Sequence, residues 1–150
     1  MTESGPSEEV LPPRILGIDP GERRVGVAVS DPMGWTAQPV EVIDARGGDA
    51  AVVDRIREIA REYEAAKIVV GYQINMDGSH GPRAKVVDAF VARLAEATSI
   101  PVETSDERLT TVEAEDALRQ SGMSWQKQRK KVDVVAAQLI LQRYLDGRKS

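Results

Sequence analysis

Three short runs of strand-forming residues come early in the chain. Residues 15–18 (ILGI), 25–30 (VGVAVS) and 37–43 (AQPVEVI) have the length and the apolar content of strands. Turns that contain Pro and Gly separate them, and the turn at residues 20–24 (PGERR) is too short for a parallel crossover. The pattern predicts a three-stranded antiparallel meander.

Apolar residues then recur at helical spacing, with charged residues between them. The first such stretch carries Val52, Ile56, Ile59, Ala60 and Tyr63, and the second carries Val86, Val87, Phe90, Val91 and Leu94. The second helix is expected to begin at Pro82, since Pro is favoured at the first helical position. Residues 67–71 (KIVVG) and 100–107 (IPVETSDE) predict one strand after each helix.

Two further helices are predicted near the C-terminus. Residues 110–122 carry a capping-box pair, Thr110 and Glu113, and end at Gly122. Residues 132–145 (VDVVAAQLILQRYL) are apolar around most of the helix, so this helix should be largely buried. Strands joined through helices should be parallel, with right-handed crossovers. The order βββαβαβαα therefore predicts an α/β fold: a mixed five-stranded sheet, formed by the meander and two parallel strands, with helices on both faces.

The composition is that of one globular domain. The chain has 150 residues, of which 41% are hydrophobic. It has no cysteine, which excludes disulfides and thiolate metal sites and fits a reducing, cytoplasmic compartment. No apolar run approaches the ~20 residues of a membrane span. We expect a disordered acidic tail at residues 1–13, one domain at residues 14–146 and a short tail at residues 147–150.

Three carboxylates stand in unusually apolar surroundings. Asp19 ends the first strand, Glu107 (beside Asp106) ends the last strand, and Asp133 lies in the first turn of the last helix. Each has a plain structural alternative: turn formation, helix capping and interaction with the helix dipole, respectively. Sites in open α/β sheets, however, form at the carboxyl ends of the strands, where Asp19 and Glu107 should emerge together within reach of Asp133.

Convergence of these three acids would be costly without a cation. At a separation of about 5 Å and an effective dielectric constant of ~20, each pair repels by ~3 kcal/mol and three pairs by ~10 kcal/mol. This repulsion is comparable to the stability of a whole domain. The acids must therefore stay apart, take up protons or share a cation. An all-carboxylate set favours Mg²⁺ or Mn²⁺.

Four segments together resemble the RuvX/YqgF family: "RILGIDPGERRVGVAVSDPMG", "VVGYQINMDGSHGPRA", "DERLTTVEAE" and "KKVDVVAAQLILQRYLD". The resemblance covers residues 14–146 in the family's order. This family belongs to the ribonuclease H-like superfamily and is associated with Holliday-junction resolution and with maturing the 5′ end of pre-16S ribosomal RNA. The family's usual GLP reads Gly71-Tyr72-Gln73 in this chain.

The resemblance implies a ribonuclease H-like nuclease domain in which Asp19, Glu107 and Asp133 are the catalytic metal ligands. The expected reaction is hydrolysis of phosphodiester bonds by an endonuclease that uses one or two Mg²⁺ or Mn²⁺ ions. RuvC-type resolvases carry a second acid on the last helix, where this chain has Ala136 and Ala137. The substrate would be junction DNA, in recombination and repair, or precursor rRNA, in ribosome biogenesis. The ribosome is a further expected partner, and a monomer and a homodimer both stay open.

Every one of these acids has a basic neighbour in sequence, although the net charge of the chain is −4. Lys and Arg bind phosphates regardless of base sequence. The expected nucleic-acid contacts are Arg23, Arg24, Asn75, Ser79, Arg83, Arg108, Lys127, Arg129, Lys130 and Lys131. His80 is expected to form hydrogen bonds within its loop. Trp35 and Trp125 are expected to pack in the core or against loops, with stacking on bases as the alternative.

Two other functions stay open at this point. A non-catalytic RNA- or ribosome-binding factor would keep the basic residues and would not need the acids. Phosphoryl transfer is the second alternative, because residues 17–29 (GIDPGERRVGVAV) also resemble the first phosphate motif of the actin and sugar-kinase superfamily. Those enzymes bind ATP between two such domains, and 150 residues have room for one.

Overall fold

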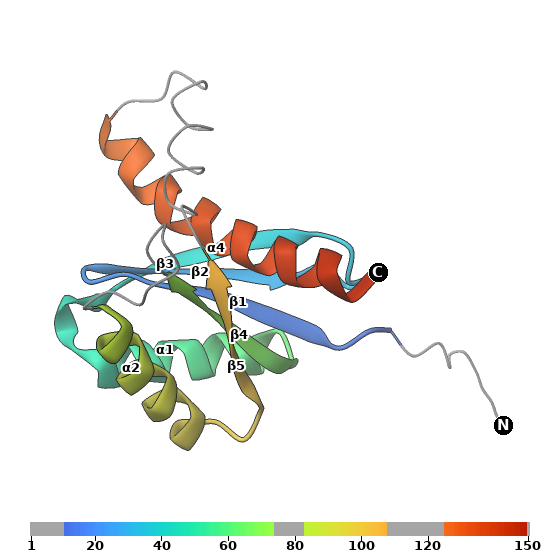
Figure 1. Ribbon diagram of the computed structural model, residues 1–150, viewed down its shortest axis with the longest axis horizontal. Helices are drawn as coiled ribbons and strands as arrows, with labels where there is room; N and C mark the ends of the chain where they lie inside the picture. Colours follow the sequence, from blue (N-terminus) through green and yellow to red (C-terminus); the bar gives the residue numbers. More distant parts are fainter. Residues whose placement is uncertain (1–10, 74–82, 108–124, 150) are drawn as a thin grey trace, which may run out of the picture.

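A five-stranded mixed sheet lies at the centre of the computed structural model, which describes residues 11–73, 83–107 and 125–149 (Figure 1). Its strands are β1 (Arg14–Pro20), β2 (Arg24–Ser30), β3 (Ala37–Asp44), β4 (Ala65–Gln73) and β5 (Val102–Glu107), in the spatial order β3-β2-β1-β4-β5. Strands β1 to β3 are antiparallel neighbours, and β4 and β5 continue the sheet parallel to β1. The predicted mixed sheet is therefore confirmed.

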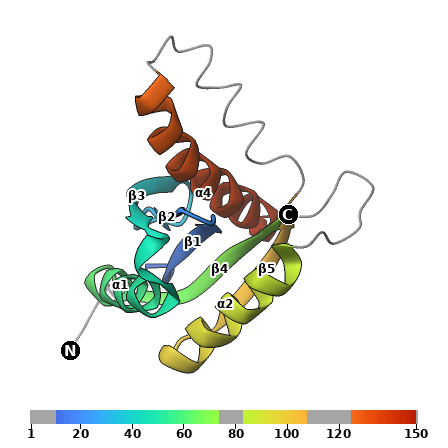
Figure 2. The same ribbon diagram turned by 90° about the vertical axis from the view of Figure 1, so that its left-hand side faces the viewer.

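Helices cover both faces of this sheet, as predicted (Figure 2). One face is covered by α1 (Asp49–Glu62) and α2 (Arg83–Ala97), and the other by α4 (Trp125–Lys149). A short 3₁₀ helix, η1 (Ala45–Gly47), joins β3 to α1. The loop predicted at residues 75–82 and the helix predicted at residues 110–122 lie outside the described residues.

The alternation of side chains along β1 divides the core into two layers. Leu16 and Ile18 belong to the core that α1 and α2 cover, whereas Ile15 belongs to the core beneath α4. The buried side of α4 consists of Ala136, Ala137, Ile140, Leu141 and Leu145. These positions recur at intervals of three and four residues, which places them on one stripe of the helix.

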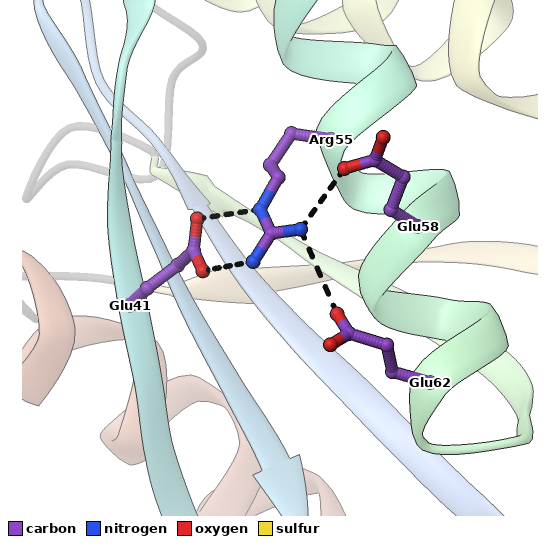
Figure 3. Close-up of polar contacts among 4 residues, drawn as sticks. All are labelled: Glu41, Arg55, Glu58 and Glu62. Carbon is purple, nitrogen blue, oxygen red and sulfur yellow. Dashed lines mark hydrogen bonds and ion pairs between the residues drawn. The ribbon is translucent and has the colours of Figure 1, made fainter.

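A guanidinium group also ties α1 to the edge strand β3 (Figure 3). Arg55 donates from Nη2 to Oε1 of Glu41 at 2.6 Å and from Nε to Oε2 at 2.9 Å. The same side chain reaches Glu58 at 2.9 Å and Glu62 at 3.6 Å. These carboxylates raise the pKa of Arg55, with the hydrogen bonds to Glu41 as the largest cause. One arginine therefore holds three glutamates where the helix lies beside the strand.

Two details of the predicted helices were wrong. The last helix begins at Trp125 instead of Val132, because the basic run at residues 126–131 consists of good helix formers and continues the helix. Val86 was expected on the apolar face of α2 but is 52% exposed. The buried stripe of α2 runs through Ala84, Val87, Phe90 and Leu94, and Val86 lies one residue to the side of it.

Candidate active site

Asp19 is a buried carboxylate near the carboxyl end of the central strand. Only 6% of the residue is exposed, and in the register of the sheet it lies opposite Gly26 of β2. Because side chains alternate along a strand, Asp19 shares the face of Ile15, which packs beneath α4. The first strand thus delivers its acid to the α4 face of the sheet.

Two glycines allow α4 to approach this face closely. A Cβ atom at Gly17 would lie 2.7 Å from Cβ of Leu141, and a Cβ atom at Gly71 would meet the side chain of Ile140. Lys67, nearer the start of β4, instead contacts Tyr144 at 2.9 Å. The helix therefore runs opposite to β1 and β4, with its later residues over the amino ends of these strands.

This direction places the backbone of Asp133 toward the Asp19 end of the sheet. Asp133 precedes Ala136 and Ala137 by three and four residues, so its backbone lies one helical turn before them on the same side of the helix. The side chain of Asp133 lies outside the described part of the structure. Its position in the helix nevertheless agrees with the predicted meeting of the two acids.

The register of β5 distinguishes the two adjacent acids at its end. Glu107 pairs with Gln73 and Asp106 pairs with Tyr72. Tyr72 belongs to the core beneath α1 and α2, whereas Glu103, four residues before Glu107, bonds Lys67 beneath α4. Strand positions two and four residues apart share a face, so position 107 lies on the face of Asp19 and position 106 on the opposite face. The side chains at 106 and 107 are not among those described.

Asp19 is the one predicted metal ligand whose side chain the structure describes. Among the described side chains, no group of three or more His, Cys, Asp or Glu residues is arranged to hold an ion. Two of the three predicted ligands, Glu107 and Asp133, fall outside that set. The observations that remain fit a divalent cation: Asp19 is a buried carboxylate, and positions 107 and 133 lie on its face and toward its end of the sheet. All three donors are oxygen atoms, which suits Mg²⁺ or Mn²⁺.

A groove of about 700 Å³, the basic groove, lies along the edge strand β3 and reaches Val134 of α4. Its lining consists of Arg23, Arg24, Pro39, Val40, Glu41, Val42, Asp44, Arg46 and Val134. In the sheet register Asp19 pairs with Gly26, and Gly26 pairs with Val42 of the groove. The groove thus includes Arg24 on β2, the strand next to that of Asp19, and Val42 on β3, which lies two strands or about 10 Å from Asp19 at the usual strand spacing.

The groove brings together two of the predicted phosphate contacts and one arginine that the sequence analysis missed. Arg23 and Arg24 were predicted, whereas Arg46 was not, because an isolated arginine after a strand gives no signal in the sequence. Arg24 pairs with Asp44 in the register, and Asp44 forms an ion pair with Arg46 at 2.7 Å. The hydrogen bonds from Arg46 hold the pKa of the Asp44 carboxyl well below its ordinary value, with a smaller contribution from Arg24.

The other predicted contacts are less fully described. Asn75, Ser79, His80 and Arg108 lie outside the described residues. For Arg83, Trp125, Lys127, Arg129, Lys130 and Lys131 the structure gives the helical backbone but not the side chains.

Trp35 is not a core residue. It is 57% exposed in the turn between β2 and β3, at the opposite end of β1 from Asp19. Asp31 accepts hydrogen bonds from the backbone N–H groups of Trp35 and Thr36 in this turn. Trp35 is therefore remote from Asp19 along the sheet. Within the described ranges, no helix is long and apolar enough to cross a membrane.

Comparison with known protein families adds a finding that the geometry alone does not contain. Residues 13–147 match the RuvX family model, which is described as "Holliday junction resolvase". A protein of Pelotomaculum thermopropionicum named "Putative pre-16S rRNA nuclease" is 51% identical over 134 residues, which cover 89% of this chain and 87% of that protein. A relative of the same name from Ruminiclostridium cellulolyticum is 45% identical over 133 residues, covering 89% of this chain and 94% of its own.

The fold is also similar to that of two solved RuvC structures. A structure described as "T. thermophilus RuvC in complex with Holliday junction substrate" superposes with a TM-score of 0.58 at 17% identity, covering 91% of this chain and 96% of that one. A second structure, of Thermus thermophilus RuvC, gives a TM-score of 0.54 at 16% identity, with the same coverage. The expected ribonuclease H-like fold is confirmed.

Proposed function

The chain belongs to the RuvX family, and from this premise we propose that it is a Mg²⁺- or Mn²⁺-dependent endonuclease that hydrolyses phosphodiester bonds in structured nucleic acid. One observation carries the proposal. A buried carboxylate, Asp19, lies on the α4 face of the sheet, with the backbone positions of Glu107 and Asp133 on that face and a basic groove along the neighbouring strands β2 and β3. This juxtaposition gives a place for a divalent cation next to a place for phosphates.

Asp19, Glu107 and Asp133 would hold one or two divalent ions. When bound there, such an ion supplies a Lewis acid for the phosphoryl group and lowers the pKa of water, which makes a nucleophile available at neutral pH. The protein contributes oxygen donors on regular elements of the fold. Asp19 lies on the central strand, Glu107 at the end of β5, and Asp133 on α4, which packs against the sheet that contains both strands. Mutual repulsion of the three carboxylates favours binding of the cation.

Arg23 and Arg24 have a separate task, which is to bind the substrate backbone. They line the basic groove and offer donors for phosphate oxygens. Contacts of this kind position a strand without reading its bases, so the chain would recognise the shape of its substrate. The names of the relatives favour precursor rRNA, and the name of the family favours four-way DNA junctions. Both substrates belong in the test.

The proposal is tested by a cleavage assay that offers a pre-16S rRNA 5′ leader and a four-way DNA junction in parallel. The wild-type protein should cut at least one of them with Mg²⁺ or Mn²⁺, and EDTA should stop the reaction. Asp19→Asn should bind the same substrate and lose cleavage by on the order of 10³-fold, the scale of losing one essential charge-stabilising group. Absence of cleavage by the wild type, with binding of RNA intact, would instead identify a non-catalytic binding factor.

A further inference from the structure

Arg46 lines the basic groove in a defined orientation. Its Nε donates to Oδ1 of Asp44 at 3.0 Å, and its Nη2 donates to Oδ2 at 2.7 Å. The backbone N–H of Arg46 also donates to Oδ1 at 2.9 Å, since Asp44 is the N-cap of η1. One carboxylate therefore holds both the main chain and the guanidinium of Arg46.

The Asp44–Arg46 pair contributes little to holding the fold together. The Arg46 side chain is 77% exposed and that of Asp44 is 58% exposed, and ion pairs in water add little to stability. The geometry of the pair matters more than its energy, because it holds a flexible side chain of the groove lining in one orientation. A guanidinium has five N–H donors. Within the part of the chain that the structure describes, the contacts to Asp44 use Nε and Nη2, and the N–H groups of Nη1 remain for another acceptor.

The charge around this point favours a phosphate as that acceptor. Arg23, Arg24 and Arg46 line the groove, and Asp44 and Glu41 are the carboxylates there. Glu41 is already engaged by Arg55 through both of its oxygens. Asp44 is engaged by Arg46 through both of its oxygens. The described lining of the groove therefore carries three arginines and two carboxylates, and both carboxylates are bonded to arginines.

We propose that Arg46, oriented by Asp44, binds a backbone phosphate of the nucleic-acid strand that lies in the basic groove. Arg46 is a substrate-binding residue and Asp44 is a positioning residue that acts through it. Because the contact is with a phosphate, it does not depend on the base sequence. The inference rests on the proposed function for the identity of the strand, but it concerns binding and not cleavage.

The experiment measures binding under conditions in which no cut occurs. Fluorescence anisotropy with a labelled pre-16S leader RNA and a labelled four-way DNA junction is recorded in EDTA, at several salt concentrations. Arg46→Ala is compared with Arg57→Ala, which removes the same charge from an exposed arginine on α1, on the other face of the sheet. Arg46→Lys keeps the charge but loses the planar fork.

Arg46→Ala should weaken binding of the better substrate by about tenfold and reduce the slope of log K against log salt by about one. Arg46→Lys should keep the salt slope and regain part of the affinity. Arg57→Ala should change the affinity by less than about twofold, as expected for a charge remote from the groove. Equal effects of Arg46→Ala and Arg57→Ala would overturn the inference.

The role of Asp44 is tested by a double-mutant cycle with Asp44→Asn. If Asp44 orients Arg46, the loss caused by Arg46→Ala should be smaller in the Asp44→Asn background than in the wild type. Full additivity of the two substitutions would overturn the positioning role. A wild-type protein that binds but never cleaves would contradict the proposed nuclease and leave this inference standing. A wild-type protein that cleaves, together with an Arg46→Ala variant that binds normally, would support the nuclease and overturn this inference.

Discussion

Gly17 of β1 lies directly against Leu141 of α4. A Cβ atom at position 17 would stand 2.7 Å from Cβ of Leu141 and 3.1 Å from the carbonyl oxygen of Ala137. Because one of these atoms belongs to the helix backbone, the neighbour cannot rotate away as a side chain could. The glycine therefore sets the distance between the central strand and the helix that carries Asp133.

Gly17→Ala should push α4 away from the sheet and destabilise the protein by about 2 kcal/mol, the usual cost of overpacking a core. Cleavage should fall as well, since Asp133 would move relative to Asp19. Urea denaturation monitored by circular dichroism measures the change. Gly47→Ala is the matched control, because a Cβ atom there would meet Ala51 at an ordinary 3.8 Å. Equal stability of the two variants would contradict the close approach.

Arg55→Lys should destabilise the protein by about 1 kcal/mol, because an ammonium group cannot replace the two-pronged contact with Glu41. The expected loss of stability is small because the Arg55 and Glu41 side chains are about one third exposed, and water weakens the ion pair. Arg57→Lys provides the comparison, as Arg57 makes only a 3.7 Å ion pair with Asp54. Thermal unfolding measures the effect of each substitution. If Arg57→Lys lowers the midpoint as much as Arg55→Lys does, the contacts between Arg55 and Glu41 do not contribute to stability.

Asp31→Asn should lower stability at pH 7 and make less difference in acid. Hydrogen bonds from backbone N–H groups, that of Thr36 foremost, lower the pKa of Asp31 below its ordinary value of 3.8. The folded state then binds fewer protons than the unfolded state between the two pKa values, so stability rises with pH in that window. The contribution of Asp31 is present above about pH 3.8 and is lost as the pH falls through the lower, folded pKa. Denaturation curves of the wild type and Asp31→Asn at pH 7 and pH 3 measure the difference in their free energies of unfolding. A difference that stays constant or increases at pH 3 would contradict this role of Asp31.

The adjacent acids at the end of β5 should differ sharply in their effect on cleavage. Glu107→Gln should abolish cleavage and Asp106→Asn should leave most of it, because the register puts position 107 on the face of Asp19 and position 106 on the other. Initial rates at saturating Mg²⁺ separate the two. Asp106 and Glu107 are adjacent acids, so each variant is a control for the other. Loss of activity in Asp106→Asn alone would show that Asp106, and not Glu107, serves the site.

Much of this fold could be predicted from the sequence because its elements are strongly patterned. The meander, the parallel strands and the buried last helix follow from apolar periodicity, and Asp19 stands out as an acid at the end of an apolar strand. Arg46 could not be predicted, since its partner Asp44 and its neighbour Arg24 meet only through the register of β2 and β3. Nor could the sequence show which of Asp106 and Glu107 faces the site. Adjacent strand residues point to opposite faces of the sheet, and only the pairing of β5 with β4 shows which residue lies on which face.

The central claim is that Asp19, Glu107 and Asp133 share a divalent cation, and direct metal binding tests it without reference to any substrate. Mn²⁺ binding is measured by calorimetry for the wild type, for Asp19→Asn, Glu107→Gln and Asp133→Asn, and for Asp106→Asn as the matched control. The account predicts that each of the first three substitutions weakens binding at least about tenfold, while Asp106→Asn binds like the wild type. Wild-type affinity in the three variants, or equal weakening in Asp106→Asn, would contradict it.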